Sequence, residues 1–575
     1  SVDMYLHTYI HNFPGKTVQT KIFKNPSRTP TIVFDFCGTL GIFIKSNDEI
    51  LSGGRLNLCQ ERVENFLQKL KNMGTDLVFF DDGPIKEEKI SLCLKRVNKR
   101  YEEQCEHFEK IRKSEPIYMR MKLRTSFCLY EVFLRIAKKY GKYFQSFHNE
   151  GDRDCAAYAT KIKATAVMTL DSDFLIMPGD WPIWIPHTID IERNTIIAWH
   201  KKALRNALGL MQSQMPIFSI LSGNDWTHPE RFNNFSTTIN LTSLLSKGEF
   251  IRNHFPRGVP LSKDKFLHLV RLIYDNGQNS CTMEEAKEMV DTSLRFYSYD
   301  DQHTPEIFPE WLKKHSEDTS SNIVYTIVKK CPLMVHQGFI DLSLSNVRPY
   351  AELALPILRK QMGIIDYHKS RKNIERIIYL KPSHEEPFQQ QTTTPIFPDF
   401  EIPPLNILLG YDVTEEENAN LADKRLEIFC WSISTGTYQV KPEVFKIVEN
   451  RVYIPSILVL AYLVKERQIS SEEADVMLLS IYETINTSYE KLESIRPPEL
   501  YDPRGFWLAH VFLRLRQVYF YTFLICGLNE YRQYDAYDGF IFHNLFKKYQ
   551  LLNSEEKRNL RKPIECYRIY ANHMP

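Results

Sequence analysis

Acidic side chains follow a series of short apolar runs in the first 230 residues of the chain. In order they are Asp35, Asp81, Asp82, Glu150, Asp152, Asp171, Asp173 and Asp225. Taken singly, an aspartate after an apolar run is typical of a turn or a helix N-terminus. Carboxylates that converge must bind protons or cations, because two of them ~4 Å apart repel by roughly 4 kcal/mol at an effective dielectric near 20. All-oxygen ligation favours Mg²⁺ or Mn²⁺ over zinc.

The elements around these acids predict a parallel α/β sheet flanked by helices. We expect strands over 31–36, 76–82, 142–147 and 165–170, helices over 61–74, 131–141 and 152–162, and one more strand over 215–221. Because the carboxyl ends of parallel strands share one edge, the acids should meet in one cleft. Two divalent ions ~3.5 to 4 Å apart in such a cleft would activate a water for phosphodiester hydrolysis and stabilise the leaving oxygen.

The ordered motifs resemble those of the flap endonuclease superfamily (XPG-like, with a PIN-like fold). The segments VFDF, FFDDGP, EGDRDCA, TLDSDF and SGNDW carry the resemblance, and EGDRD and DSDF are most similar to the Asteroid family. The resemblance implies a two-metal, structure-specific nuclease of the endonuclease type. It places Asp35, Asp82, Glu150 and Asp152 at the first metal ion, and Asp171, Asp173 and Asp225 at the second. Asp82, directly before Gly83, fits the motif better than Asp81.

The segment from Lys86 to Arg124 concentrates positive charge. It holds twelve lysines and arginines and seven glutamates, whereas the whole chain has a net charge of +2. We predict that it binds nucleic acid as an arch or gateway over a single strand, through Lys86, Lys89, Arg96 and Arg100 on one helical stripe and Arg120, Lys122 and Arg124 on one strand face. The resemblance implies that Lys89 and Arg96 contact the scissile phosphate. The alternative is a solvated helix balanced by Glu87 and Glu88.

The remaining chain is expected to be mainly helical. The domains predicted are a nuclease domain over 1–230 with the basic insertion near 86–124, a helical extension over 231–386, a Pro-rich linker or extended edge segment over 387–404, and a helical C-terminal domain over 405–575. Ser470 or Ser471 with Glu473 indicates a helix start. The apolar run 506–528 contains His510, Arg514 and Arg516, which favours a buried helix over a membrane span.

Cysteine and histidine spacing gives little sign of a further site. The eleven cysteines show neither a disulfide framework nor zinc-ligand spacing, which predicts a reducing compartment. An intracellular setting, nuclear or cytoplasmic, is expected from the implied nucleic-acid substrate and from the start of the sequence. The first residues do not have the pattern of a signal peptide. Histidines such as His200 and His254 show no paired spacing, so core or surface roles are expected.

Two hypotheses follow. The first is a Mg²⁺- or Mn²⁺-dependent nuclease that cuts single-stranded flaps or overhangs of DNA or RNA. The second is a catalytically weak or silent nuclease-fold scaffold that binds proteins or RNA through its helical C-terminal region. The segment 225–245 lacks the glycine-rich helix-turn-helix with which flap endonucleases grip duplex DNA. Grip on a substrate must therefore come from another part of the chain, or be weak.

Overall fold

The computed structural model describes most of the 575 residues. The described residues are 17–21, 29–115, 127–227, 243–255, 257, 261–276, 281–299, 308–336, 347–370, 374–383, 385–436, 438–533 and 535–571. Arg120, Lys122 and Arg124 of the predicted basic strand lie outside them, as does most of the segment that follows Asp225. The chain divides into two compact units, each of which is built from separated segments.

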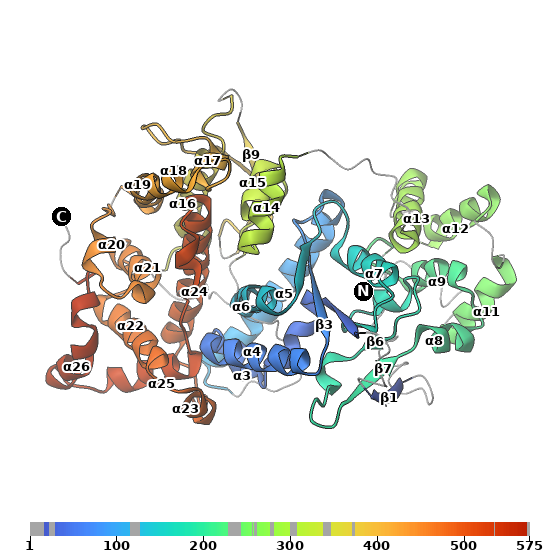
Figure 1. The fold of residues 1–575 in the computed structure, drawn as a ribbon, viewed down its shortest axis with the longest axis horizontal. Helices are drawn as coiled ribbons and strands as arrows, with labels where there is room; N and C mark the ends of the chain where they lie inside the picture. Colours follow the sequence, from blue (N-terminus) through green and yellow to red (C-terminus); the bar gives the residue numbers. More distant parts are fainter. Residues whose placement is uncertain are drawn as a thin grey trace. The chain divides into compact units, whose positions relative to one another are not determined.

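A seven-stranded sheet forms the centre of the first unit, which comprises the described residues within Ser1–Ile42, Asn65–Gly83 and Ala137–Ile307 (Figure 1). The strand order is β1-β7-β6-β5-β2-β3-β4. The strands are β1 Thr17–Lys21, β2 Thr31–Asp35, β3 Asp76–Asp81, β4 Lys142–Gln145, β5 Ala166–Met168, β6 Ile183–Trp184 and β7 Thr195–Trp199. Five adjacent strands run parallel to one another: β6, β5, β2, β3 and β4. β7 pairs antiparallel with β6, and β1 pairs antiparallel with β7. The predicted fold class, a parallel α/β sheet flanked by helices, is confirmed.

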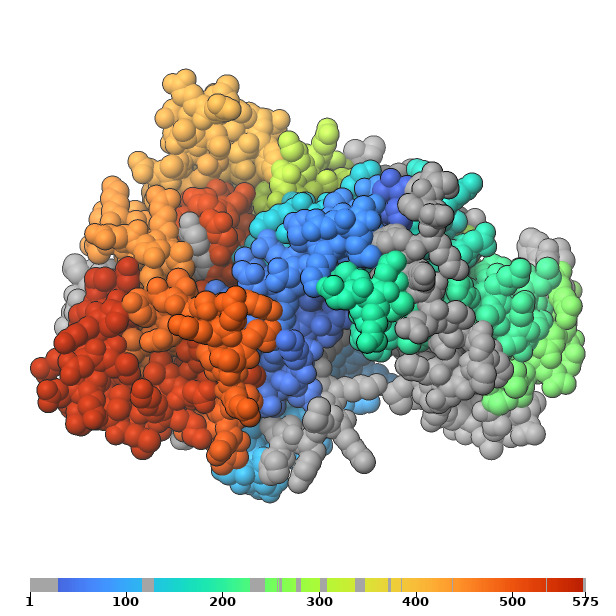
Figure 2. Space-filling model, turned by 60° about the horizontal axis from the view of Figure 1, so that its bottom comes forward, coloured from blue at the N-terminus to red at the C-terminus, as the bar shows by residue number. Residues whose placement is uncertain are grey.

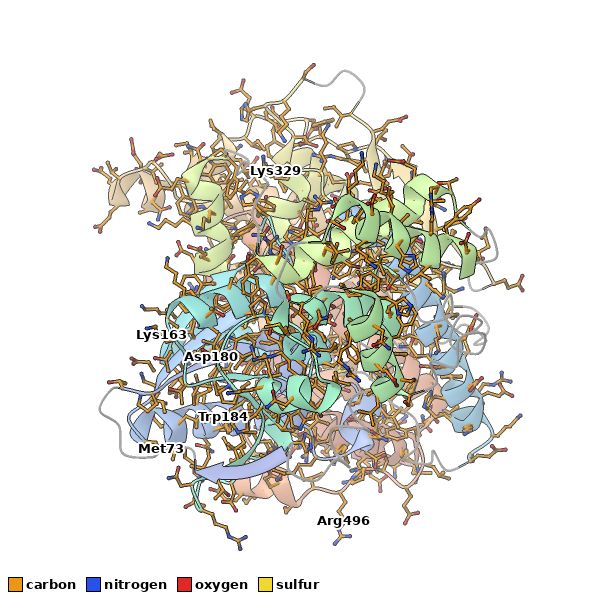
Figure 3. All side chains as sticks on the ribbon, turned by 90° about the vertical axis from the view of Figure 1, so that its right-hand side faces the viewer. Met73, Lys163, Asp180, Trp184, Lys329 and Arg496 are labelled. Atoms are coloured by element: carbon orange, nitrogen blue, oxygen red, sulfur yellow. The ribbon has the colours of Figure 1, made fainter. Side chains whose placement is uncertain are left out.

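The parallel strands bring the ends of β2, β3 and β5 to one edge. Asp35 pairs with Phe80, one residue before the end of β3, and Phe34 pairs with Met168 at the end of β5. The central strands are apolar and almost fully buried, as expected for strands covered on both faces. Met73 and Lys163, which Figure 3 labels, precede β3 and β5 and therefore mark the opposite edge.

Helices of the first unit pack on this sheet and on each other. They are α2 Phe36–Thr39, the second half of α4 Leu56–Asn72, the end of α6 Phe127–Tyr140, α7 Gly151–Lys161, α8 Lys201–Leu208, α9 Met215–Ser222, α11 Leu244–His254, α12 Lys263–Asn276 and α13 Met283–Ser298. Short 3-10 turns are η1 Leu40–Phe43, η3 Ser172–Leu175, η4 Pro186–Thr188 and η5 Gln212–Gln214. Buried side chains of β5, α7, α9, α11, α12 and α13 share one hydrophobic core.

The strand predicted over 215–221 is wrong, because these residues form the helix α9. The run is apolar apart from Ser219 and is buried on nearly all sides, so its hydrophobic pattern has no period that separates a strand from a helix. Pro216 lies in the first turn, where a proline fits a helix, and Gly223 ends it with a φ of 82°.

The second unit comprises the described residues within Phe43–Glu64, Pro84–Ile136 and Phe308–Pro575, and it is mainly helical. Its helices are α3 Asn47–Leu51, the first half of α4, α5 Ile90–Arg112, most of α6, α14 Glu310–Thr319, α15 Ile323–Val328, α16 Tyr350–Ile365, α17 Leu405–Leu408, α18 Glu415–Asn420, α19 Ala422–Ile433, α20 Val444–Ile447, α21 Ile454–Lys465, α22 Ser471–Ile485, α23 Tyr489–Ser494, α24 Pro503–Ile525, α25 Gly539–Gln550 and α26 Ser554–Arg561. Its 3-10 turns are η2 Glu87–Lys89, η7 Arg451–Tyr453, η8 Asn529–Gln533 and η9 Lys562–Tyr567. A three-stranded sheet has the order β10-β9-β8, with β8 Leu333–Met334, β9 Arg376–Leu380 and β10 Gln389–Thr393.

Two features of the second unit agree with the sequence. Ser470 is the N-cap of α22, and Ser470 and Glu473 accept hydrogen bonds from each other's backbone N–H groups at 3.1 and 2.8 Å. The Pro-rich segment contains β10, which pairs antiparallel with β9 at the edge of the small sheet. Extended edge structure, one of the two alternatives, is therefore present at residues 389–393.

The apolar run 506–528 lies largely in α24, whose polar side chains have internal partners. Arg516 is 1% exposed and donates to the carbonyls of Ala536 and Asp535 at 3.0 and 3.1 Å. His510 contacts the carbonyl of Leu51 at 2.8 Å, and burial lowers its pKa to about 4. Within the described part of the chain, no helix has the length and hydropathy that a membrane crossing would require.

Candidate metal centre

The end of β2 supplies a buried carboxylate. Asp35 is 6% exposed, and Thr169, which follows β5, donates its hydroxyl to Asp35 Oδ2 at 2.6 Å. The backbone N–H of Asp171 donates to the same hydroxyl at 2.9 Å, so Thr169 ties the two strand ends together. Burial raises the pKa of Asp35 to about 7; Thr169 opposes the rise, and repulsion from Asp82 and Asp171 adds to it. Gly38 completes the packing, because a Cβ there would lie 2.4 Å from Asp35 Oδ2.

The two aspartates at the end of β3 have different surroundings. Asp81 is 2% exposed, and its Oδ2 accepts hydrogen bonds from Tyr143 Oη at 2.7 Å and Gln145 Nε2 at 3.0 Å. Asp82 is exposed, and the Cys37 thiol donates to its Oδ2 at 3.4 Å. Asp82 is thus the member of the pair that is available to a ligand.

The N-terminus of α7 places two further acids beside Asp82. Glu150 is the N-cap residue of α7, and Asp152 lies in its first turn, where the helix dipole favours negative charge. Gly151 lies between them, and a Cβ on it would come within 2.1 Å of Asp82 Oδ1. The end of β3 and the start of α7 therefore approach each other closely, which requires glycine at position 151.

The segment after β5 holds the next pair. Asp171 caps η3, and its Oδ1 accepts the backbone N–H of Asp173 at 2.9 Å. Asp173 is 3% exposed, and its Oδ1 accepts a hydrogen bond from the Tyr297 hydroxyl of α13 at 3.1 Å. Both carboxylates are therefore held in fixed orientations by neighbouring donors.

A buried hydrogen-bond chain links Tyr297 to the turn that carries Asp225. Ser219 of α9 donates to the Tyr297 hydroxyl at 2.8 Å, and Asn224 Nδ2 donates to Ser219 Oγ at 3.2 Å. Asn224 Oδ1 also accepts the backbone N–H groups of residues 226 and 227 at 3.0 Å, which fixes the turn. Burial raises the pKa of Tyr297 well above its usual value, and the nearby carboxylates of Asp173 and Asp225 raise it further. The phenol therefore stays protonated and acts as a donor.

Three of the predicted acids converge at ligand distance. One carboxylate oxygen from each of Asp152, Asp171 and Asp173 lies within 4.8 Å of the other two. In an octahedron with bonds of ~2.1 Å, neighbouring oxygens lie about 3 Å apart and opposite ones about 4.2 Å apart, so the three carboxylates would have to draw closer together to ligate one Mg²⁺. The donor set is all oxygen and fits Mg²⁺ or Mn²⁺. No other group of this kind occurs among the described residues.

The other four acids flank this group. Asp35 acts electrostatically on Asp82 and lies within reach of Asp171, while Glu150 and Asp225 lie at the start of α7 and in the turn after α9. All seven predicted ligands belong to the first unit. The structure groups Asp152 with Asp171 and Asp173, whereas the resemblance assigns Asp152 to the first metal ion and the other two to the second.

The predicted basic residues have a different setting. Lys86 precedes η2, Lys89 is the N-cap residue of α5, and Arg96 and Arg100 lie within α5, so the four do not share one continuous α-helix. All four belong to the second unit. α5 packs there through Phe108, whose ring centroid is 5.6 Å from that of Phe506 in α24. α5 is therefore supported by the C-terminal region.

Magnesium binding is expected to strengthen as the pH rises through about 7, because Asp35 must lose its proton before it can ligate a cation. The pKa of Asp35 in the folded chain lies above its unfolded value of about 3.9. The stability of the metal-free protein should accordingly fall as the pH rises from about 4 to 7, since in this range the folded state holds a proton that the unfolded state has lost. Calorimetric titration with MgCl₂ from pH 5.5 to 8.5 checks this, with an affinity gain of at most about tenfold per pH unit below pH 7.

The Asp35→Asn variant is the control for this titration. It removes the ionising group and should flatten the pH dependence between pH 6 and 8. A wild-type affinity that is constant from pH 5.5 to 8.5 would show that Asp35 does not take part in binding.

Comparison with known proteins gives partial similarities. No protein-family model matches the chain. A mouse protein named constitutive coactivator of peroxisome proliferator-activated receptor gamma is 26% identical over 215 residues, which is 37% of this chain and 27% of the relative. The human protein of the same name is 25% identical over 215 residues, covering 37% of this chain and 23% of the relative. The matched region spans about a quarter of the length of these relatives.

Solved structures show a similarity at low sequence identity. The catalytic core of Rad2 in complex with DNA substrate is 16% identical with a TM-score of 0.30, covering 56% of this chain and 94% of that chain. Human GEN1 in complex with Holliday junction DNA is 11% identical with a TM-score of 0.32, covering 73% of this chain and 92% of that chain. The chain is thus similar in sequence to a coactivator over part of its length, and in structure to chains of Rad2 and GEN1.

Proposed function

We propose that the chain is a Mg²⁺- or Mn²⁺-dependent nuclease that hydrolyses phosphodiester bonds in single-stranded flaps or overhangs of DNA or RNA. The observation that carries the proposal is the convergence of Asp152, Asp171 and Asp173, with four more acids beside them, at one edge of a parallel sheet. Such a concentration of carboxylates is costly unless cations neutralise it. A fold that bound no cation would be more stable if neutral residues replaced some of these carboxylates.

Each part of the site has a role in this proposal. Asp152, Asp171 and Asp173 hold one divalent ion, and Asp35, Asp82, Glu150 and Asp225 complete two metal positions. Bound divalent ions would supply an activated water and stabilise the leaving oxygen. Thr169 and Tyr297 keep Asp35 and Asp173 oriented through hydrogen bonds of 2.6 and 3.1 Å. The family resemblance assigns the scissile phosphate to Lys89 and Arg96, which belong to the second unit.

The charge distribution along α5 supports the nucleic-acid part of the proposal. Five cations lie at or near its N-terminus, with no acidic residue among them: Lys89, Lys95, Arg96, Lys99 and Arg100. Lys89 at the N-cap opposes the helix dipole, and the other four form a run of like charge in the first half of α5, which an anionic partner would neutralise. The sequence prediction that Arg120, Lys122 and Arg124 also bind nucleic acid concerns residues outside the described ones.

A cleavage panel tests the proposal. Labelled flaps of both polarities, overhangs, single strands, hairpins and blunt duplexes, each as DNA and as RNA, are incubated with the full chain and Mg²⁺ or Mn²⁺. We expect cuts in the substrates with single-stranded parts, none in blunt duplexes, and none in EDTA. Failure to cut any member of the panel with either ion would contradict the proposal.

A second candidate function is a nuclease-fold scaffold that is catalytically silent. It is favoured by the sequence similarity to proteins named constitutive coactivator of peroxisome proliferator-activated receptor gamma, which suggests protein partners. Calorimetric metal titration separates the two candidates. Two divalent sites with cleavage favour the nuclease, and the absence of any metal binding favours the scaffold.

A further inference from the structure

A row of aromatic rings lies on the helices that follow the acidic site. α11 contributes Phe250 and His254, whose ring centroids are 4.1 Å apart with an interplanar angle of 23°. α12 contributes His268, whose ring is 6.4 Å from that of His254 at an interplanar angle of 18°. The three rings are therefore nearly parallel and join two helices. We name Phe250, His254 and His268 the ring platform.

The ring platform is accessible, while the opposite side of the two helices is buried. His254 is exposed, and Phe250 and His268 are half-buried. Ile251 of α11 and Leu269 of α12 are fully buried in the core of the first unit. The green region that contains these helices reaches the surface in the space-filling view (Figure 2). The rings are thus presented at the surface by helices whose other faces are anchored.

The surroundings of the ring platform are cationic. Burial lowers the pKa of His268, and the charges of Lys265, His254 and Arg271 lower it further. Among the described residues, the charged groups that act most strongly on His268 are therefore all cationic. The segment from Lys247 to Arg271 holds six lysines and arginines and two acidic residues.

This arrangement is poorly explained by stability alone. Cations at the end of α11 are favoured by its dipole, but in the first turn of α12 Lys263 and Lys265 outnumber Asp264 and oppose the dipole of that helix. Two parallel imidazoles also repel each other when both are protonated. Both costs are removed by a partner that supplies flat rings and negative charge together.

We infer that the ring platform is a stacking surface for a single-stranded nucleic acid, whose bases lie on the rings and whose phosphates contact Lys265 and Arg271. Single strands are bound by aromatic side chains beside cations, with each base contributing separately. The choice of a nucleic acid as occupant rests on the proposed function. The ring platform would hold the strand in place of the duplex-gripping motif, which is missing from the sequence of residues 225–245.

The helix pair also connects the ring platform to the acidic site. α12 packs along α13, and α13 carries Tyr297, which donates to Asp173. α11 packs on α9, which carries Ser219 of the same hydrogen-bond chain. All of these helices belong to the first unit. A strand held at the ring platform is thus bound by the unit that holds the carboxylates.

Binding without cleavage tests the inference. Fluorescence anisotropy in EDTA measures the affinity of the full chain for a labelled 20-nucleotide single strand and for an abasic strand of equal length. His254→Ala with His268→Ala should weaken binding of the ordinary strand by roughly tenfold, because stacking is lost. Binding of the abasic strand should change less than twofold. Lys265→Ala with Arg271→Ala should weaken both strands and reduce the slope of log affinity against log salt by about 1.4.

Matched variants separate stacking from other effects. His187→Ala removes an exposed histidine of the same unit outside α11 and α12, and should leave both affinities unchanged. His254→Phe keeps a flat ring and should retain binding of the ordinary strand. If the double histidine variant unfolds by circular dichroism, the single His254→Ala variant, which changes an exposed side chain at a helix end, gives the same comparison with a smaller expected loss.

The outcomes distinguish the inference from the proposed function. An ordinary-strand affinity within twofold of wild type in the folded histidine variant would overturn the inference, whether or not the chain cleaves nucleic acid. A tenfold loss specific to the ordinary strand supports the inference even if the cleavage panel shows no activity. Equal losses for the ordinary and abasic strands would also overturn it, since stacking would then contribute nothing.

Discussion

Replacing Asp171 and Asp173 with asparagine is expected to reduce cleavage at least about 1,000-fold, because two of the three converging metal ligands lose their charge. Asparagine keeps an oxygen that can accept the hydrogen bonds from the backbone of residue 173 and from Tyr297. The local geometry should therefore persist. Single-turnover cleavage of the best substrate in the panel, at saturating Mg²⁺, measures the effect.

The stability of the same variant provides an internal check. Removing two negative charges from a repulsive cluster should raise the melting temperature of the metal-free protein, while magnesium should no longer stabilise it. Asp180→Asn is the matched control, since Asp180 is an exposed aspartate of the same unit (Figure 3). It should leave cleavage and metal binding unchanged. Undiminished cleavage by the purified Asp171→Asn, Asp173→Asn protein would refute the assignment of the site.

Replacing Arg55 with leucine is expected to destabilise the second unit by about 3 to 5 kcal/mol, the cost of leaving a buried carboxylate without its partner. Arg55 is 2% exposed, and its Nε lies 2.9 Å from Oδ2 of Asp538, whose side chain is fully buried. Its guanidinium also donates to the carbonyl of Leu492 at 2.6 Å and covers the ring of Phe540 at 4.3 Å. Asp538 in turn caps α25. Hydrogen exchange at the backbone amides of α25 measures the local free energy of opening.

A double-mutant cycle shows whether the ion pair itself is responsible. Asp538→Asn keeps an oxygen that can cap α25, and combining it with Arg55→Leu should recover part of the loss, since no unpaired charge remains. The exposed pair Lys69 and Glu192, 2.9 Å apart, is the comparison, and Lys69→Ala should cost less than about 1 kcal/mol. An Arg55→Leu effect as small as that of Lys69→Ala would contradict the prediction.

The part of the fold that the sequence predicts is the part set by local pattern. β2, β3 and β5 are short apolar runs that end at polar residues, and their parallel pairing follows from the helices between them. The preference for Asp82 over Asp81 agrees with burial, because Asp81 is enclosed by Tyr143 and Gln145. The acids meet because each follows an element that ends at the same edge.

What the sequence could not predict depends on contacts between distant residues. Tyr297 lies 124 residues after Asp173, and no spacing connects the two. His254 and His268 show no pattern in the sequence, and become neighbours only because α11 and α12 pack against the same core. Asn224 was recognisable only as the neighbour of Asp225, although its side chain fixes the turn. Tertiary packing brings such residues together, and a local sequence pattern does not reveal it.

The interleaving of the two units has a consequence for how the protein is made. Residues 43–64 and 84–136 leave the ribosome early, yet their partners in the second unit lie within 308–575. Arg55 must wait for Asp538, almost 500 positions later, before its charge is neutralised. Such a high contact order predicts slow maturation and a nascent intermediate with exposed apolar surface, which chaperones would have to protect until residues 308–575 have been made.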